Sequence, residues 1–422
     1  MKIAIVGAGI SGLATAQAIL TRVPLADLTV YEAAPRPGGK VMTEITDSGY
    51  LCEWGVNGFL DKSPRTLELC SELGLQVLPA DVSAKRRFVF SDGELHKLPE
   101  TRHLGREAFE KLIDPMASGV FAGDARTMSL KSCFPRIHEV ENEYGSLIRG
   151  LVSLQKKARK AGRKDTPGPG PGGILTSFED GMSELTDTIA ARLGERIRYA
   201  TPVQSIEFTG DAYLVQTADG GEDPFQALVL ASPAYAQEAM LRRMAPELSG
   251  LVGGISYPSL AVVCLGYDRN DVGGVMDGFG FLVPSREKRK ILGTVADSFV
   301  FPNRAPEGRV LLRSMVGGAR ASELAELSDE PLLDLVRSNL AEIMGVTAEP
   351  EFASIYRHAK AIPQYLVGHS DRLQAIDDEL RKFPGLFMTG NAFRGVSLND
   401  CVLNAGATAE SVIGFMPRSM RG

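Results

Sequence analysis

Residues 2–13, with the sequence KIAIVGAGISGL, constrain the fold of this 422-residue chain more than any other segment. The apolar run at residues 3–6 suits a buried parallel strand. Gly7, Gly9 and Gly12 follow with the G-x-G-x-x-G spacing, which permits a tight turn, close approach of the backbone to a pyrophosphate, and close packing of a helix on the strand. The phosphates would lie at the start of that helix, where free N–H groups and the helix dipole favour negative charge.

A second apolar run, residues 28–31, ends in Glu32, which lies 20 residues beyond Gly12. A carboxylate at this position can accept hydrogen bonds from both hydroxyls of a ribose. The two strands and this carboxylate together predict a bound adenine dinucleotide, either NAD or FAD. Its expected contacts are Gly7, Ala8, Gly9, Ile10, Ser11, Gly12, Glu32 and Ala33. The alternative is an ordinary strand, turn and helix without a ligand.

Composition limits the class of protein. With 44% apolar and 23% charged residues, the chain suits a globular protein of two or three domains, and a net charge of −6 argues against nucleic acid as a partner. It contains no run of about 18 apolar residues and begins directly with the first strand, so we expect a cytoplasmic protein. The five cysteines are scattered and do not cluster with the five histidines, so we expect neither a metal site nor structural disulfides.

The segment after Glu32 distinguishes between the two dinucleotides. Residues 33–40 read AAPRPGGK, in which paired glycines permit close approach of the backbone while Arg36 and Lys40 can meet phosphate charge. The A-x-R-x-G-G pattern resembles the second fingerprint of flavoproteins in the amine oxidase and protoporphyrinogen oxidase superfamily. The resemblance implies FAD as the cofactor, with Arg36, Gly39 and Lys40 beside it.

Three later segments resemble flavin-contacting parts of the same superfamily. Residues 53–59 are similar to its E-x-G-P-x-S/G-F segment beside the isoalloxazine ring, with Val56 where proline is common, and a strand around Val203 matches one whose backbone contacts the adenine. Residues 395–401 match the string G-V-x-x-N-D-C and lead into a final helix expected over 402–413, whose first N–H groups can stabilise negative charge on the reduced flavin. The implied contacts are Gly55, Val56, Asn57, Gly58, Val203, Asn391, Val396, Ser397 and Leu398.

A hairpin expected over residues 86–98 carries the first candidate substrate contact. Its residues 87–90, RFVF, match the R-F-x-Y segment of protoporphyrinogen oxidases, in which the arginine pairs with a propionate of the substrate. A planar guanidinium suits a carboxylate better than an ammonium does. The alternative for Arg87 is a solvated position at the edge of a strand.

Further segments extend the resemblance to the substrate pocket of that family. Residues 114–135, with SGVFAGD, and residues 277–284, with GFGFLVP, are similar to segments that enclose a tetrapyrrole, and residues 363–369 match its P-Q-Y-x-x-G-H signature. The resemblance implies a tetrapyrrole pocket lined by Arg87, Met116, Gly119, Phe279, Gly280, Leu282 and Met315.

The chain departs from the family after Pro99, where tens of residues of helix are expected but the sequence continues almost directly to residues 103–106. The basic stretch 155–164, QKKARKAGRK, is expected to be a solvated helix end, with contact to an anionic membrane surface as the alternative. Residues 166–173, TPGPGPGG, are expected to form a linker.

We therefore expect an α/β fold with three parts. A Rossmann-like FAD-binding domain would comprise residues 1–60, 174–235 and 385–422, and a mixed-sheet substrate-binding domain residues 61–98 and 236–384. Residues 99–173 would form a small, shortened helical domain of the membrane-contact type.

The resemblance implies FAD-dependent oxidation of protoporphyrinogen IX to protoporphyrin IX in haem biosynthesis, with dioxygen as acceptor. Asn57 is the candidate catalytic residue, by position. Coproporphyrinogen III is an alternative substrate, because Arg86 beside Arg87 offers a second cation to its propionates. Amine oxidation and a non-catalytic flavin- or porphyrin-binding role are further alternatives, and we also consider a homodimer and a peripheral location on the inner face of the cell membrane.

Overall fold

In the computed structural model, the first apolar run forms the central strand of a five-stranded parallel sheet. The structure describes residues 1–97, 113–160, 173–272 and 277–420. The strands of this first sheet follow the order β10 (Ile197–Arg198), β2 (Asp27–Tyr31), β1 (Lys2–Val6), β14 (Ala227–Leu230) and β20 (Leu386–Met388). Ile3 and Ile5 face one core, whereas Ala4 and Val6 face another. Burial on both faces explains why the run is continuously apolar.

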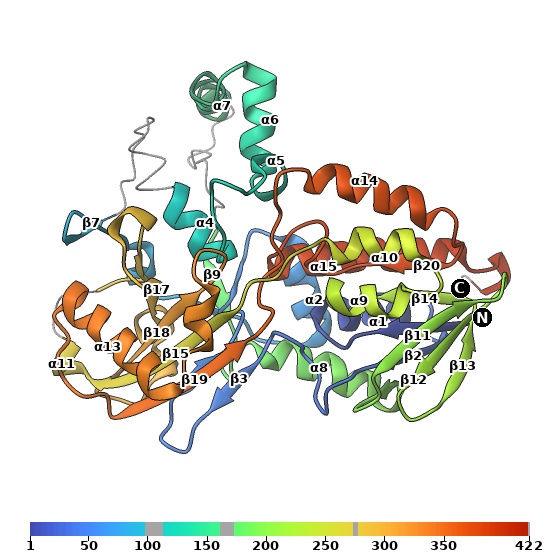
Figure 1. Cartoon of the computed structure of the whole chain (residues 1–422), viewed down its shortest axis with the longest axis horizontal. Coiled ribbons are helices and arrows are strands. Elements are labelled where there is room, and N and C mark those ends of the chain that lie inside the picture. Colours follow the sequence, from blue (N-terminus) through green and yellow to red (C-terminus); the bar gives the residue numbers. More distant parts are fainter. Residues whose placement is uncertain (98–112, 161–172, 273–276, 421–422) are drawn as a thin grey trace.

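Both faces of the first sheet are covered, which confirms the expected Rossmann-like architecture (Figure 1). One face packs against α1 (Ile10–Arg22), α2 (Pro64–Leu73), α8 (Ser183–Leu193) and α15 (Leu398–Phe415). The other packs against an antiparallel sheet of β11 (Val203–Phe208), β12 (Tyr213–Thr217) and β13 (Glu222–Phe225), and against α9 (Ala234–Leu241), α10 (Pro246–Gly253) and α14 (His369–Leu380).

A second sheet, of seven strands, lies at the opposite end of the long axis (Figure 1). Its order is β19 (Phe352–His358), β15 (Leu260–Asp268), β18 (Arg309–Gly317), β17 (Ile291–Ala296), β16 (Gly280–Leu282), β7 (Arg87–Ser91) and β8 (Glu94–Lys97). Only the β16–β7 pair is parallel, so the mixed sheet is confirmed, as is the β7–β8 hairpin. Helix α13 (Asp329–Met344) covers one face, and the short helices α11 (Arg269–Val272) and α12 (Asp297–Val300) flank the sheet.

Short strands connect the two large sheets. They are β3 (Thr43–Ile45) with β4 (Leu51–Glu53), and β5 (Phe59–Leu60) and β6 (Leu78–Pro79), which both pair with β9 (Leu175–Ser177). The cores divide the chain differently from the boundaries expected at residues 61, 236 and 384. Helix α2 contributes to one core of the first sheet, and α9, α10 and α14 contribute to the other.

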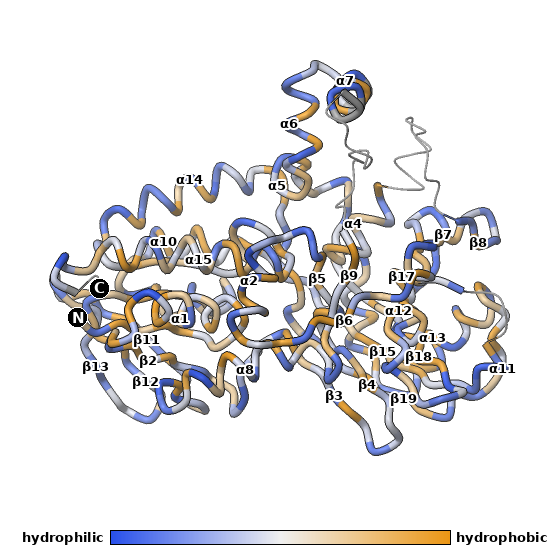
Figure 2. Tube along the Cα trace, turned by 180° about the vertical axis from the view of Figure 1, so that it is seen from behind, coloured by the Kyte–Doolittle hydropathy of each residue, from blue (hydrophilic) through white to orange (hydrophobic). Residues whose placement is uncertain are grey.

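The helices α4 (Asp114–Phe121), α5 (Leu130–Cys133), α6 (Pro135–Tyr144) and α7 (Leu147–Lys160) follow the hairpin. Figures 1 and 2 show α6 and α7 projecting from the body of the molecule. Among the described residues, none of the helices has the length and apolar character needed to cross a membrane. The shortened segment after Pro99 and most of the linker at 166–173 lie outside the described residues, so membrane contact stays a prediction.

The last helix begins earlier than the sequence suggested. We expected it from Val402, but α15 begins at Leu398, because Ser397 and Asp400 form a capping box. The Ser397 hydroxyl accepts the Asp400 N–H at 3.1 Å, and the Asp400 carboxylate accepts the Ser397 N–H at 3.2 Å. The G-V-x-x-N-D-C string therefore supplies the first turn of the helix instead of a loop before it.

A buried ion pair joins the first sheet's loops to the second sheet. Glu53, at the end of β4, and Arg304 are both fully buried, with their Oε1 and Nη2 atoms 3.5 Å apart. The carboxylate also accepts the Met182 N–H and the Thr43 hydroxyl, each at 2.8 Å, while Arg304 donates to the Ser177 hydroxyl at 2.6 Å. Burial raises the pKa of Glu53 to about 7, against the opposing effects of Arg304 and the two donors.

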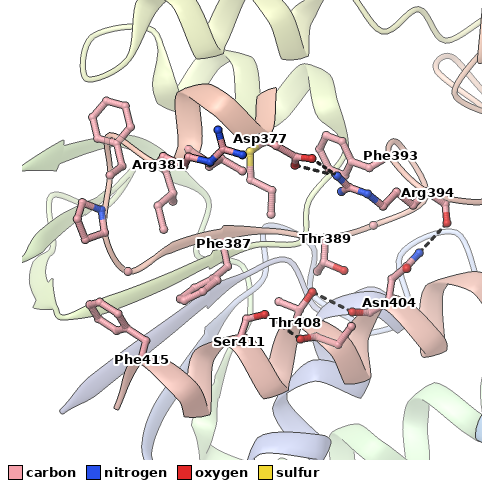
Figure 3. Close-up of a pocket in the computed structure, with 18 residues that line it drawn as sticks. Asp377, Arg381, Phe387, Thr389, Phe393, Arg394, Asn404, Thr408, Ser411 and Phe415 are labelled. Carbon is pink, nitrogen blue, oxygen red and sulfur yellow. Dashed lines mark hydrogen bonds and ion pairs between the residues drawn. The ribbon is translucent and has the colours of Figure 1, made fainter. Parts of the chain in front are cut away.

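The outer edge of β20 borders a groove of about 760 Å³ between α14 and α15 (Figure 3). Phe387, Phe393 and Phe415 line it, and an ion pair between Arg394 and Asp377 lies at one end. None of the residues expected at the cofactor or substrate sites lines this groove.

Replacing Arg304 with methionine should destabilise the protein, because it leaves Glu53 buried without its cation. We expect a loss of about 3–5 kcal/mol in the free energy of unfolding at pH 8, measured by chemical denaturation of the FAD-loaded protein. The loss should increase as the pH rises above about 7. In the folded parent the pKa of Glu53 is about 7, so the free energy of unfolding stops falling once the pH exceeds this value. In the variant this pKa is higher, so the free energy of unfolding continues to fall as the pH rises further.

Arg22→Met is the matched control, because Arg22 forms an exposed pair with Glu410. We expect its effect to stay below about 1 kcal/mol. Equal losses in the two variants would contradict a structural role for the buried pair.

Candidate cofactor and substrate site

The turn between β1 and α1 has the geometry that its glycines require. Gly7 has a φ of 108°, and a Cβ on Gly12 would lie 1.9 Å from the Gly7 carbonyl oxygen. The nearest atom to a Cβ on Gly9 would be the Gly38 carbonyl oxygen at 4.0 Å, so the backbone of Gly9 is open to a ligand. Ala8, Ile10 and Ser11 complete the turn and the first residues of the helix.

Glu32 is fixed directly beside this turn. Its carboxylate accepts the N–H groups of Ala8 at 2.7 Å and Ala34 at 2.8 Å. A carboxylate has about four acceptor positions, so it retains capacity for ribose hydroxyls. The Glu32 carbonyl accepts the Thr201 N–H at 2.8 Å, which brings the chain leading to Val203 to the same place.

Gly38 and Gly39 pack onto the turn between β1 and α1, whereas the neighbouring Arg36 side chain bonds to nearby backbone carbonyls. The Gly38 N–H donates to Ala8 at 2.8 Å. Arg36 donates to the carbonyls of Pro37 and Gly39, both at 2.9 Å. Contact of its charge with phosphate stays a prediction.

Lys40 is buried at the junction of the two sheets. Its ammonium donates to the carbonyls of Lys360, at 2.8 Å, and Ala361, and lies 5.0 Å from the centre of the Tyr257 ring. Burial lowers the pKa of Lys40 to about 8. Here too, contact with phosphate stays a prediction.

Residues 55–58 cross this junction. A Cβ on Gly55 would lie 1.9 Å from the Lys40 carbonyl oxygen, and one on Gly58 would lie 2.7 Å from that of Thr176, so neither position tolerates a side chain without movement. Val56 packs against the first core. The side-chain oxygen of Asn57 is buried without a hydrogen-bond partner, which marks a place where a polar ligand atom is needed.

The start of α15 completes the predicted cofactor group. Leu398 shares a core with Ile10, so α15 and α1 begin side by side. Ser397 caps the helix and leaves the N–H groups of its first residues without intrahelical acceptors. Val396 packs beside α4, and the Asn391 carbonyl accepts the Tyr365 hydroxyl at 2.6 Å.

Ser232 is a candidate contact that the sequence patterns did not single out. It follows β14, its backbone nitrogen would lie 3.0 Å from a Cβ on Gly7, and its hydroxyl is buried without a partner. Ligands of open α/β sheets bind at the carboxyl ends of the strands, and that rule would have identified it.

The geometry of these residues fits FAD. The open backbone at Gly9, the carboxylate of Glu32 and the unpartnered oxygens of Asn57 and Ser232 all suit a dinucleotide. The start of α15 offers N–H groups to a flavin.

The predicted substrate residues gather around β16 and β7. Arg87 pairs with Gly280 in the parallel register, and its guanidinium lies 5.1 Å from the centre of the Phe279 ring. Phe279 and Met315 pack against one cluster. Burial lowers the pKa of the Arg87 guanidinium, and among the described residues no carboxylate pairs with it.

Helix α4 completes this group. A Cβ on Gly119 would lie 2.5 Å from a methyl carbon of Leu282, so the helix backbone rests directly on β16. Asp114 anchors the helix through Arg320, at 3.2 Å, and the Ser285 N–H, at 2.8 Å. Met116 lies three residues before Gly119 on the same helix and so shares its face.

Comparison with known proteins identifies the family. The sequence model described as "Flavin containing amine oxidoreductase" matches residues 10–102 and 91–413. The chain is 30% identical to the chloroplastic protoporphyrinogen oxidase of Oryza sativa subsp. japonica, covering 98% of this chain and 88% of the relative. It is 28% identical to the coproporphyrinogen III oxidase of Bacillus subtilis (strain 168), covering 98% of both chains.

Solved structures agree with this assignment. A structure from Exiguobacterium sp. 255-15, described as "Putative protoporphyrinogen oxidase", superposes with a TM-score of 0.82 at 26% identity, covering 97% of this chain and 98% of the other. A reduced UDP-galactopyranose mutase, at 16% identity and a TM-score of 0.74, shares the fold and covers 100% of this chain and 97% of the other. The protein is therefore an FAD-dependent oxidoreductase and belongs to the flavin-containing amine oxidoreductase family.

Proposed function

We propose that the protein oxidises protoporphyrinogen IX to protoporphyrin IX with FAD. The observation that carries the proposal is the exposed Arg87 guanidinium, which has no carboxylate partner among the described residues and lies 5.1 Å from the centre of the Phe279 ring, in the same cluster as Met315. A tetrapyrrole with carboxylate side chains suits this combination of one cation and adjoining apolar side chains. The porphyrinogen oxidases among the relatives support the same class of substrate.

Each part of the site would have a distinct role. Bound FAD would accept the electrons and hydrogen removed from the porphyrinogen, with dioxygen as the final acceptor. Arg87 would hold a propionate, while Phe279, Leu282 and Met315 would exclude water from the macrocycle. Asn57 would orient a polar atom of cofactor or substrate with its unpartnered oxygen. Dioxygen, a homodimer and the peripheral membrane location stay predictions.

The environment of Arg86 favours protoporphyrinogen over coproporphyrinogen. Its Nη2 lies 2.5 Å from an Asp277 carboxylate oxygen, and its Nε donates to the Asp277 carbonyl at 2.6 Å. Coproporphyrinogen has four propionates and would require a second cation beside Arg87. Arg86, the candidate for this role, is already paired with the Asp277 carboxylate.

Arg87→Ala should raise the KM for protoporphyrinogen about ten- to a hundredfold, the scale of one charge-assisted bidentate contact. FAD occupancy, measured from the visible absorbance of the purified protein, should not change. Arg86→Ala is the matched control, since its charge is held by Asp277, and its KM should change less than about twofold. An unchanged KM in Arg87→Ala would remove this residue from the substrate site.

Turnover of the two porphyrinogens decides between the substrates. We expect the parent protein to prefer protoporphyrinogen, and Asp277→Asn, which frees Arg86, to increase kcat/KM for coproporphyrinogen about threefold. A clear preference of the parent for coproporphyrinogen would refute our choice of substrate. Amine-dependent peroxide formation would favour an amine oxidase, and a bound flavin that porphyrinogen does not bleach under anaerobic conditions would favour a non-catalytic binding protein.

A further inference from the structure

Residues 363–369, PQYLVGH, follow β19 and end at His369, the first residue of α14, and none of them has been given a role of its own in the proposed function. Tyr365 is 1% exposed, and its ring stacks on that of His369, with centroids 4.1 Å apart. A tyrosine that is buried this deeply needs partners for its hydroxyl.

The Tyr365 hydroxyl bridges two points of the loop between β20 and α15. It donates to the Asn391 carbonyl at 2.6 Å and accepts the Gly395 N–H at 2.9 Å. His369 reaches the same loop through the Phe393 carbonyl, 3.0 Å from its Nε2. Burial raises the pKa of Tyr365, so its hydroxyl keeps the proton that it donates.

Two further polar anchors of this loop are exposed. Arg394 pairs with Asp377 at 2.5 Å, with half of the arginine side chain exposed, and the Asn404 side chain donates to the Arg394 carbonyl at 2.7 Å (Figure 3). Exposed pairs contribute little. The buried bridge through Tyr365 is therefore a stronger constraint on the position of this loop than these two exposed anchors, whereas the capping box sets the first residue of α15.

The same segment also holds the helix that bears the predicted substrate contacts. The Gln364 side chain donates to the carbonyl of Phe121, the last residue of α4, at 2.8 Å. The Tyr365 carbonyl accepts the N–H of Ser129, the N-cap of α5, at 2.8 Å. Val396, just before the cap of α15, packs against the cluster that includes Phe121.

We propose that Tyr365 is a positioning residue that sets the start of α15, on the flavin side, relative to α4, on the substrate side. Its backbone and its neighbour Gln364 hold the region of α4 and α5, while its hydroxyl holds the loop leading into α15. The expected effect of Tyr365 on substrate turnover rests on the proposed function. Its expected effect on the flavin requires only that FAD is bound.

Tyr365→Phe tests this role, because it removes the hydroxyl and retains the ring that stacks on His369. In the FAD-loaded protein we expect kcat to fall about tenfold with KM changed less than about twofold, the scale of one lost hydrogen bond. The midpoint potential of the flavin should become more negative, and its visible circular dichroism should change, because the N–H groups that face the reduced flavin are displaced.

Tyr213→Phe is the matched control. Tyr213 is also fully buried, and its hydroxyl donates to a backbone carbonyl, that of Pro384, at 2.9 Å, before the opposite end of β20. We expect it to lower the melting temperature without changing the flavin potential, the circular dichroism or kcat. His369→Phe, which removes the anchor on Phe393, should shift the flavin potential in the same direction as Tyr365→Phe, and it carries the test if that variant does not fold.

An unchanged potential and an unchanged kcat in Tyr365→Phe would overturn the proposal, as would equal changes in Tyr213→Phe. If the parent protein does not oxidise porphyrinogen, the proposed function fails, but the potential and the circular dichroism still test Tyr365. The two failures are therefore distinguishable.

Discussion

The buried pair of Glu53 and Arg304 is the constraint on which the arrangement of the molecule depends. Two fully buried charges are costly unless each finds its partner and its hydrogen bonds. Glu53 ends β4, Met182 precedes α8, and Arg304 lies between β17 and β18 of the second sheet, so this pair and its hydrogen bonds require three distant segments to meet at one point. The residues immediately after Glu53 are those predicted to lie beside the flavin.

The polar side chains of the protein differ in whether they have ion-pair or hydrogen-bond partners. Arg313 of β18 and Asp297 of α12 form a buried pair at 2.6 Å, and Asp114 and Arg320 hold α4 in place. The buried side-chain oxygens of Asn57 and Ser232, by contrast, lack a hydrogen-bond partner among the described residues, and the exposed Arg87 has no carboxylate partner there. Unsatisfied buried groups are rare in folded proteins, so the oxygens of Asn57 and Ser232 are candidate contacts for a polar ligand.

Much of the fold could be predicted because local patterns determine it. The continuous apolar run of β1 requires burial on both faces, and the strands over 259–317 follow from their apolar-rich alternation. The start of α15 could not be predicted from apolar periodicity, because a polar capping box determines it. The candidate role of Ser232 depends on which strand lies beside β1. The orientation of Lys40 depends on the carbonyl of Lys360, which lies 320 positions away along the chain. Both depend on contacts between segments that are distant in the sequence, so neither can be predicted from one segment alone.

The open side of β20 has a consequence for the behaviour of the protein in concentrated solution. An unpaired sheet edge is a template for pairing with another molecule. Here β20 has only three residues and lies recessed between α14 and α15, while the opposite edge, β10, has two. The edge strand β8 of the second sheet carries Glu94 and Lys97, which disfavour such pairing. The chain thus protects these three edges against aggregation through the shortness of two strands and the charges of the third.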